Sequence, residues 1–138
     1  MKNNKKILLA EDDIIDVMTI KRALKEINIT NPLIIKENGE EALNYLMSIE
    51  KNEYPCIIIS DINMPKLNGI EFLKEIKKND ELKRIPFVIL TTSKEEADKC
   101  ESFNLGVSGY MIKPVDYINF VEVVKTINLY WTISELPD

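Results

Sequence analysis

Short apolar runs alternate with longer segments of mixed polarity along the chain. The apolar residues of each short run are contiguous, and the runs lie at residues 7–10, 33–35, 56–59, 87–90 and 110–112. Contiguous rather than alternating apolar residues predict strands that are covered on both faces, as in a parallel sheet. Pro32, Pro55 and Pro86 each directly precede a run, where a helix cannot continue.

The segments between these runs have apolar residues at steps of three and four, which predicts helices. These stripes are Val17, Ile20, Leu24 and Ile27; Ala42, Leu43, Leu46 and Met47; Ile70, Leu73 and Ile76; the thin face of Ala97, Cys100 and Phe103; and, from about residue 116, Phe120, Val123, Val124, Ile127 and Trp131. Ser93 and Glu96 have the spacing of a capping box. Strands alternating with helices predict a (βα)5 α/β fold, a doubly wound five-stranded parallel sheet.

Length and composition narrow the class of protein. A chain of 138 residues suits one compact domain, so we expect residues 1–138 to be a single domain with no effector domain. The net charge of −5 without a basic tract argues against nucleic-acid binding. No apolar run approaches the ~18 residues of a membrane span, so we expect a cytoplasmic protein. The absence of histidine excludes Ser-His-Asp catalysis, and the lack of a glycine-rich phosphate loop excludes a nucleotide-hydrolysing P-loop enzyme, so we expect no organic cofactor site.

Residues suited to phosphoryl chemistry follow four of the five predicted strands. Ligands of open α/β sheets bind beyond the carboxyl ends of the strands. The sequence there has Glu11, Asp12 and Asp13, then Asp61, then Thr91 and Thr92, and finally Lys113. Packed carboxylates repel one another unless a positive charge lies among them, and Mg²⁺ prefers oxygen ligands. A free carboxylate beside such an ion can attack phosphorus and form an acyl phosphate.

Each of these residues alone has an ordinary structural explanation. The three consecutive acids could cap the following helix, Thr91 could be a plain strand residue, and Lys113 could be a solvated lysine. Groups suited to phosphoryl chemistry nevertheless follow four strands at the same edge of the predicted sheet. Their joint occurrence favours one shared site.

The motifs at these strand ends resemble those of the response-regulator receiver family of two-component signalling. The matching segments cover nearly the whole chain and lie at residues 7–13, 60–65, 68–69, 85–91, 106 and 108–114. The resemblance implies a flavodoxin-like topology with strand order 2-1-3-4-5. It also implies a domain that accepts a phosphoryl group from a sensor histidine kinase and signals through protein contacts, as a switch rather than an enzyme.

The resemblance assigns roles around a Mg²⁺ or Mn²⁺ ion. Asp61 would be the phosphoacceptor and a metal ligand, and Asp12 would be the other carboxylate that binds the metal directly. Glu11 would act on the metal through water, and Asn63 would lend its backbone carbonyl.

It also assigns the residues that respond to phosphorylation. Lys113 would bond the phosphoryl group, and Tyr110 would be the aromatic side chain that changes rotamer. Thr91 would be the switch hydroxyl, because counting forward from Pro86 and backward from Lys113 both select it over Thr92.

A narrower resemblance is to the single-domain regulators that partner bacterial phytochrome histidine kinases. It rests on the loop of Asn63, on residues 81–86 and 90–93, and on Tyr130, Trp131, Leu136 and Pro137. Without an effector domain, output would pass through a partner, a phosphorelay or self-association. The apolar surplus at residues 127–133 favours a homodimer through the face of the fourth helix, fifth strand and fifth helix.

Two other functions compete with this interpretation. A haloacid-dehalogenase-like phosphatase also uses an aspartate nucleophile with Mg²⁺, but it needs a second acid two residues on, where this chain has Asn63. A flavin-binding module of the same topology needs a hydroxyl- and glycine-rich first loop, whereas the acids at residues 11–13 would repel the flavin phosphate.

Overall fold

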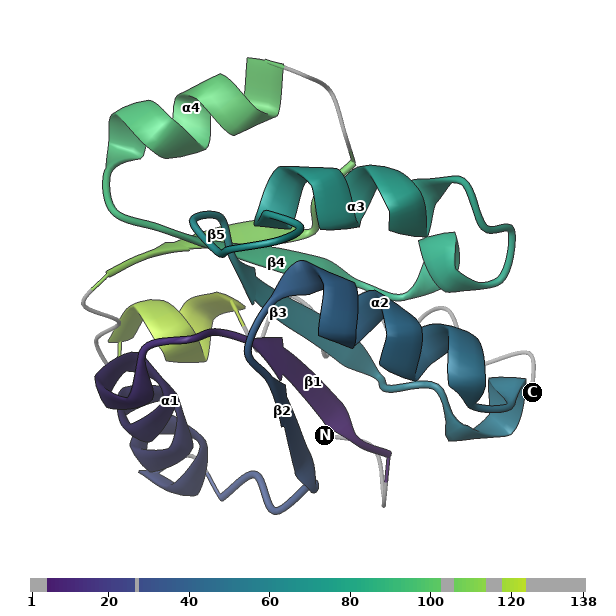
Figure 1. The fold of residues 1–138 in the computed structure, drawn as a ribbon. Coiled ribbons are helices and arrows are strands. Elements are labelled where there is room, and N and C mark those ends of the chain that lie inside the picture. The colour runs from purple at the N-terminus through teal and green to yellow at the C-terminus, as the bar shows by residue number, and fades with distance from the viewer. Residues whose placement is uncertain (1–4, 27, 103–105, 114–117, 124–138) are drawn as a thin grey trace.

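The five strands form one parallel sheet in the computed structural model, which describes residues 5–26, 28–102, 106–113 and 118–123. The strands are β1 (Ile7–Ala10), β2 (Leu33–Lys36), β3 (Ile57–Asp61), β4 (Phe87–Thr91) and β5 (Gly109–Ile112). Their order is β2-β1-β3-β4-β5 with every neighbouring pair parallel, so the expected order is confirmed. β3 therefore lies at the centre of the sheet (Figure 1).

Helices connect the strands and cover both faces of the sheet (Figure 1). They are α1 (Ile14–Glu26), α2 (Gly39–Ser48), α3 (Gly69–Lys77) and α4 (Lys94–Ser102), with 3₁₀ turns at Lys51–Glu53 and Leu82–Arg84 and further helical residues at 118–123. α1 and residues 118–123 pack on one face, and α2 and α3 pack on the other. Within these described segments, no helix combines the length and the apolar character that crossing a bilayer requires.

The core consists of two apolar layers, one on each side of the sheet. One layer joins Val17, Ile20 and Phe120 to the sheet, and the other joins Leu46 and Phe72 to it. β1, β3 and β4 are buried along their whole length, as their contiguous apolar residues predict, whereas the edge strand β2 is half-buried. Strands held from both faces provide rigid starting points for the residues that follow them.

Two details of the predicted helix stripes are wrong. Met47 is 63% exposed, because it lies about 100° around α2 from the buried Leu46. Phe72 is fully buried and packs against Phe87, although the stripe predicted for α3 omits it. The predicted stripes also include Ile27, Phe103, Val124, Ile127 and Trp131, which lie outside the described residues.

Candidate functional site

Four strand ends bring charged and hydroxyl side chains to one edge of the sheet. Glu11 directly follows β1, Asp61 and Thr91 are the last residues of β3 and β4, and Lys113 directly follows β5. The backbone N–H of Lys113 donates to the carbonyl of Thr91 at 2.7 Å, which fixes the start of the lysine side chain. Glu11, Asp61 and Thr91 are buried, and the Lys113 side chain is 14% exposed. The structure thus brings together these four residues.

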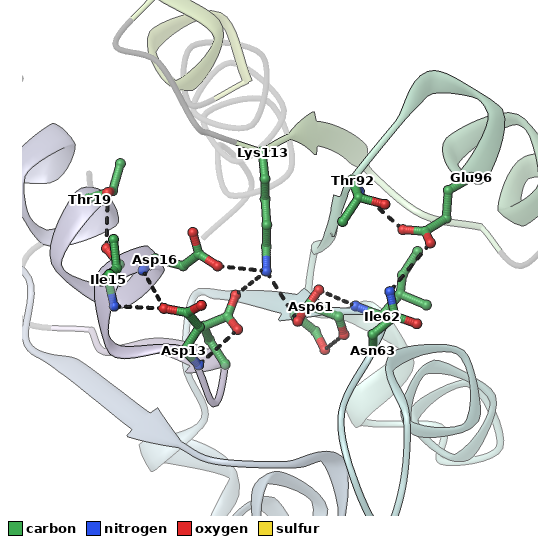
Figure 2. A network of polar contacts seen from close by, with 12 residues as sticks. Asp13, Ile15, Asp16, Thr19, Asp61, Ile62, Asn63, Thr92, Glu96 and Lys113 are labelled. Carbon is green, nitrogen blue, oxygen red and sulfur yellow. Dashed lines mark hydrogen bonds and ion pairs between the residues drawn. The ribbon is translucent and has the colours of Figure 1, made fainter.

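The ammonium of Lys113 is surrounded by carboxylates (Figure 2). Its Nζ lies 2.7 Å from Oε1 of Glu11, 2.9 Å from Oδ2 of Asp16 and 3.2 Å from Oδ2 of Asp61. An ammonium has three N–H donors and no acceptor, so one donor is available for each carboxylate. With all four groups ionised, three negative charges against one positive charge leave a surplus of two negative charges.

Burial and neighbouring charge set the protonation of this group. Burial raises the pKa of Glu11 from 4.5 to about 7; the hydrogen bond with Lys113 opposes this rise and the Asp61 carboxylate adds to it. Burial alone would lower the pKa of Lys113, but its hydrogen bonds with Glu11 and Asp16 outweigh that effect and raise it. Lys113 therefore stays an ammonium, while Glu11 can exchange a proton near neutral pH.

The described residues contain a group of oxygen donors that could hold a metal ion. Glu11, Asp12 and Asp61 each offer a carboxylate oxygen, and these atoms lie within 4.8 Å of one another. Glu11 and Asp61 are buried and Asp12 is exposed, so solvent reaches the group from the side of Asp12. Three oxygen donors fit a hard divalent cation such as Mg²⁺ or Mn²⁺.

A tight loop after β3 holds the carboxylate of Asp61. The backbone N–H of Ile62 donates to its Oδ1 at 2.8 Å, and the N–H of Gly69 donates to the carbonyl of Ile62 at 2.9 Å. A Cβ at Gly69 would collide with the backbone carbonyl oxygen of Asp61, so only glycine allows α3 to begin this close to the strand end. Asn68 caps α3 in a capping box with Glu71 and fixes the returning chain.

The switch residues expected from the sequence lie on two adjacent strands. Thr91 is fully buried, and its hydroxyl donates to the carbonyl of Ser93 at 3.1 Å. Tyr110 is half-buried on β5 opposite Ile89 and packs against the apolar layer of α2 and α3. Thr91 thus ends a strand that pairs directly with the strand of Tyr110.

Glu96 connects two loops that border the site. Its backbone N–H donates to the hydroxyl of Ser93 at 3.1 Å, as the capping-box spacing predicts, while its carboxylate accepts from the backbone N–H of Thr92 at 3.1 Å. The other carboxylate oxygen lies 3.4 Å from Nδ2 of Asn63, which is exposed (Figure 2). One side chain therefore spans the loops after β3 and β4.

Sequence reasoning missed Asp16 and the bridging role of Glu96. Asp16 follows the acidic cluster by several residues and looks like an ordinary first-turn acid of a helix. Asp12 lies before α1, which begins at Ile14, so no helical spacing relates Asp16 to the acidic cluster. The role of Asp16 is recognised only when the position of Lys113 is known.

Comparison with known proteins agrees with this geometry. The response regulator receiver domain model matches residues 7–125. The chain is 38% identical over 130 residues to response regulator Rcp1 of Synechocystis, covering 92% of this chain and 88% of that protein. A structure of the Mn²⁺-bound form of Rcp1 matches with a TM-score of 0.72 at 38% identity, covering 92% of this chain and 94% of that one.

Two phytochrome response regulators also have similar structures. Bacteriophytochrome response regulator RtBRR matches with a TM-score of 0.85 at 36% identity, covering 91% of this chain and 78% of that chain. The phosphorylated cyanobacterial phytochrome response regulator RcpA matches with a TM-score of 0.74 at 35% identity, covering 94% of this chain and 95% of that chain. Because the family model matches residues 7–125 and a 38% identical relative covers 92% of the chain, this chain belongs to the response regulator receiver family of two-component signalling.

Proposed function

We propose that this receiver domain accepts a phosphoryl group on Asp61 and signals by changing its contacts with other proteins. The observation that carries the proposal is the placement of Asp61, which ends the central strand, is 5% exposed and has its Oδ2 3.2 Å from Nζ of Lys113. A buried carboxylate beside a fixed ammonium can act as a nucleophile whose acyl phosphate product meets a cation already in place.

The donor we propose is the phosphohistidine of a sensor histidine kinase, which membership of the receiver family supports. An oxygen of Asp61 would form the new O–P bond while the P–N bond of the donor breaks, and the imidazole would leave with the electron pair of that bond. Lys113 would then donate to a phosphoryl oxygen instead of the Asp61 carboxylate oxygen. The similarity to RtBRR and RcpA supports a kinase of the phytochrome type.

The metal ligands we propose are Asp12 and Asp61 directly, Glu11 through water, and the backbone carbonyl of Asn63. The clustered carboxylate oxygens support this set, as does the Mn²⁺-bound form of the similar protein Rcp1. Bound there, Mg²⁺ or Mn²⁺ would offset the negative charge of the carboxylates and of the phosphoryl oxygens.

The switch we propose runs from Thr91 to Tyr110. The Thr91 hydroxyl would leave the carbonyl of Ser93 for a phosphoryl oxygen, and Tyr110 on the paired strand would change rotamer. The output face would comprise α4, β5 and the helical residues 118–123. Ile112 and Ile118 on that face are 40% and 67% exposed, and exposed apolar side chains of this size support a contact surface such as a homodimer.

A switch fits these residues better than a phosphatase does. The phosphatase needs a proton donor two residues after the nucleophile, and Asn63 there offers a neutral, exposed amide that lies near Glu96. Transfer of the group onward in a phosphorelay would use the same Asp61 chemistry and would differ only in the next partner.

The test is phosphorylation of Asp61 itself. Acetyl phosphate with Mg²⁺, and then an autophosphorylated histidine kinase, should add the mass of one phosphoryl group to the intact protein. Asp61→Asn should abolish this addition. The control variant Asp80→Asn, which neutralises an exposed carboxylate paired with Lys83, should still take up the phosphoryl group. Full labelling of the Asp61→Asn variant would refute the proposal.

A further inference from the structure

Asp16 lies in the first turn of α1 and reaches the strand-end site from the side. Its Oδ2 is 2.9 Å from Nζ of Lys113, and its side chain is 24% exposed, while the lysine side chain is 14% exposed (Figure 2). The pair is thus shielded enough for its charges to interact more strongly than in an exposed surface ion pair.

Lys113 has three carboxylate partners, and they differ in what else they can bind. Glu11 and Asp61 belong to the group of oxygens that could hold a metal ion, whereas Asp16 does not. Glu11 also accepts, through Oε2, from the backbone N–H of Asp13 at 3.2 Å. Asp16 is therefore the partner whose carboxylate stays available to Lys113 when the clustered oxygens take on another ligand.

We propose that Asp16 is a positioning residue that holds the ammonium of Lys113 toward Asp61 while Glu11 and Asp61 engage the metal and the phosphoryl group. The inference rests on the proposed function and adds a residue to it. A lysine side chain has four rotatable carbon–carbon bonds and loses considerable entropy when it is fixed. The backbone bond from Lys113 to Thr91 fixes only its start, so its end needs a partner that the reaction does not occupy.

Asp13 provides the control for the loss of charge. It lies at the start of the same helix, and its Oδ1 accepts from the backbone N–H of Ile15 at 2.8 Å and of Asp16 at 3.4 Å. Asparagine caps a helix about as well as aspartate. Asp13→Asn and Asp16→Asn therefore each remove one negative charge near the site. Only Asp16→Asn also breaks an ion pair with Lys113.

The first experiment observes the lysine directly by NMR of protein labelled with ¹⁵N-lysine, with the signal assigned through Lys113→Arg. A held ammonium exchanges its protons slowly enough to be seen. We expect the signal in the wild type and in Asp13→Asn, with and without Mg²⁺. In Asp16→Asn it should broaden or disappear once Mg²⁺ is added, and Asp16→Glu, which restores the charge, should recover part of it.

The second experiment measures the rate of phosphorylation by acetyl phosphate at saturating Mg²⁺. Asp16→Asn should be slower than Asp13→Asn by about three- to tenfold, the scale of one charge-assisted hydrogen bond in a partly exposed site. Equal rates for these two variants, an unchanged Lys113 signal in Asp16→Asn, or a wild-type signal lost to fast exchange would each overturn the inference. Failure of the wild type to take up any phosphoryl group would instead refute the proposed function, and the Lys113 signal would still test the role of Asp16.

Discussion

Glu11 should make the stability of the metal-free domain depend on pH in an unusual direction. Burial raises the pKa of this carboxyl from 4.5 to about 7, so the folded domain keeps a proton that the unfolded chain has released. Because the folded state binds more protons in this window, its stability is full below about pH 4.5, falls as the pH rises to about 7 and is level above that. We predict that Glu11→Gln removes most of this fall.

The size of the effect follows from the size of the pKa change. A pKa change from 4.5 to about 7, at ~1.4 kcal/mol for each pH unit, gives roughly 3.5 kcal/mol as an upper value. The charges of Lys113 and Asp61 act on the Glu11 carboxyl in opposite directions, so we expect Glu11→Gln to gain about 1–3 kcal/mol at pH ~8 and about nothing at pH ~4.5. The glutamine amide has the shape of the neutral acid and can still accept from Lys113, so the change removes the charge and keeps the bond.

Urea denaturation with a chelator, from about pH 5 to about pH 8, measures this dependence. The chain has no histidine, the side chain that usually titrates in this pH range. No histidine therefore contributes to the change in unfolding free energy that Glu11 is expected to cause. The wild-type midpoint should fall by about 1 M across the range, given the usual slopes of urea unfolding. Glu40→Gln, an exposed acid at the start of α2, should follow the wild type. Parallel curves for wild type and Glu11→Gln would refute the reasoning.

Two further predictions concern the metal and the switch. Asp12→Ala should weaken Mg²⁺ binding by roughly tenfold or more, which corresponds to ~1.4 kcal/mol for one lost charged ligand, and unchanged affinity in a calorimetric titration would contradict it. Phosphorylation should strengthen self-association by roughly 5–150-fold, the usual range of coupling between two sites. Thr91→Ala should keep the labelling of Asp61 and lose this gain. Sedimentation with and without a phosphoryl analogue measures the strength of self-association. A wild-type protein that stays monomeric in both states at high concentration would rule the dimer out.

The fold could be predicted from the sequence because several independent signals agree. Contiguous apolar runs such as Ile7–Ala10 and residues 87–90 are buried on both faces, and prolines precede three strands. The strand order came from the family resemblance, since alternating strands and helices alone leave several orders open. The error at Met47 arose because Leu43 and Met47 also follow a step of four, and only packing against the sheet decides which side of α2 is buried.

The candidate site could be predicted only where topology places residues at strand ends. Glu11, Asp61, Thr91 and Lys113 each end or follow a parallel strand, so their convergence follows from the sheet alone. Asp16 comes to the site from a helix, and its approach depends on how α1 packs against the sheet, which no short motif encodes. The raised pKa of Glu11 was equally hidden, because it depends on burial that composition does not reveal.

The surplus of negative charge links the stability of this site to its proposed chemistry. Three carboxylates around one ammonium repel one another, and the fold tolerates them because Glu11 can take up a proton and because Lys113 has a donor for each. A phosphoryl dianion would add to the same repulsion, so acceptance on Asp61 requires positive charge beyond that of Lys113. The clustered oxygens of Glu11, Asp12 and Asp61 are where a divalent cation would supply it. On this argument, burial of the Glu11 carboxylate and repulsion among the carboxylates both lower the stability of the metal-free domain, and a divalent cation bound to these oxygens would offset both.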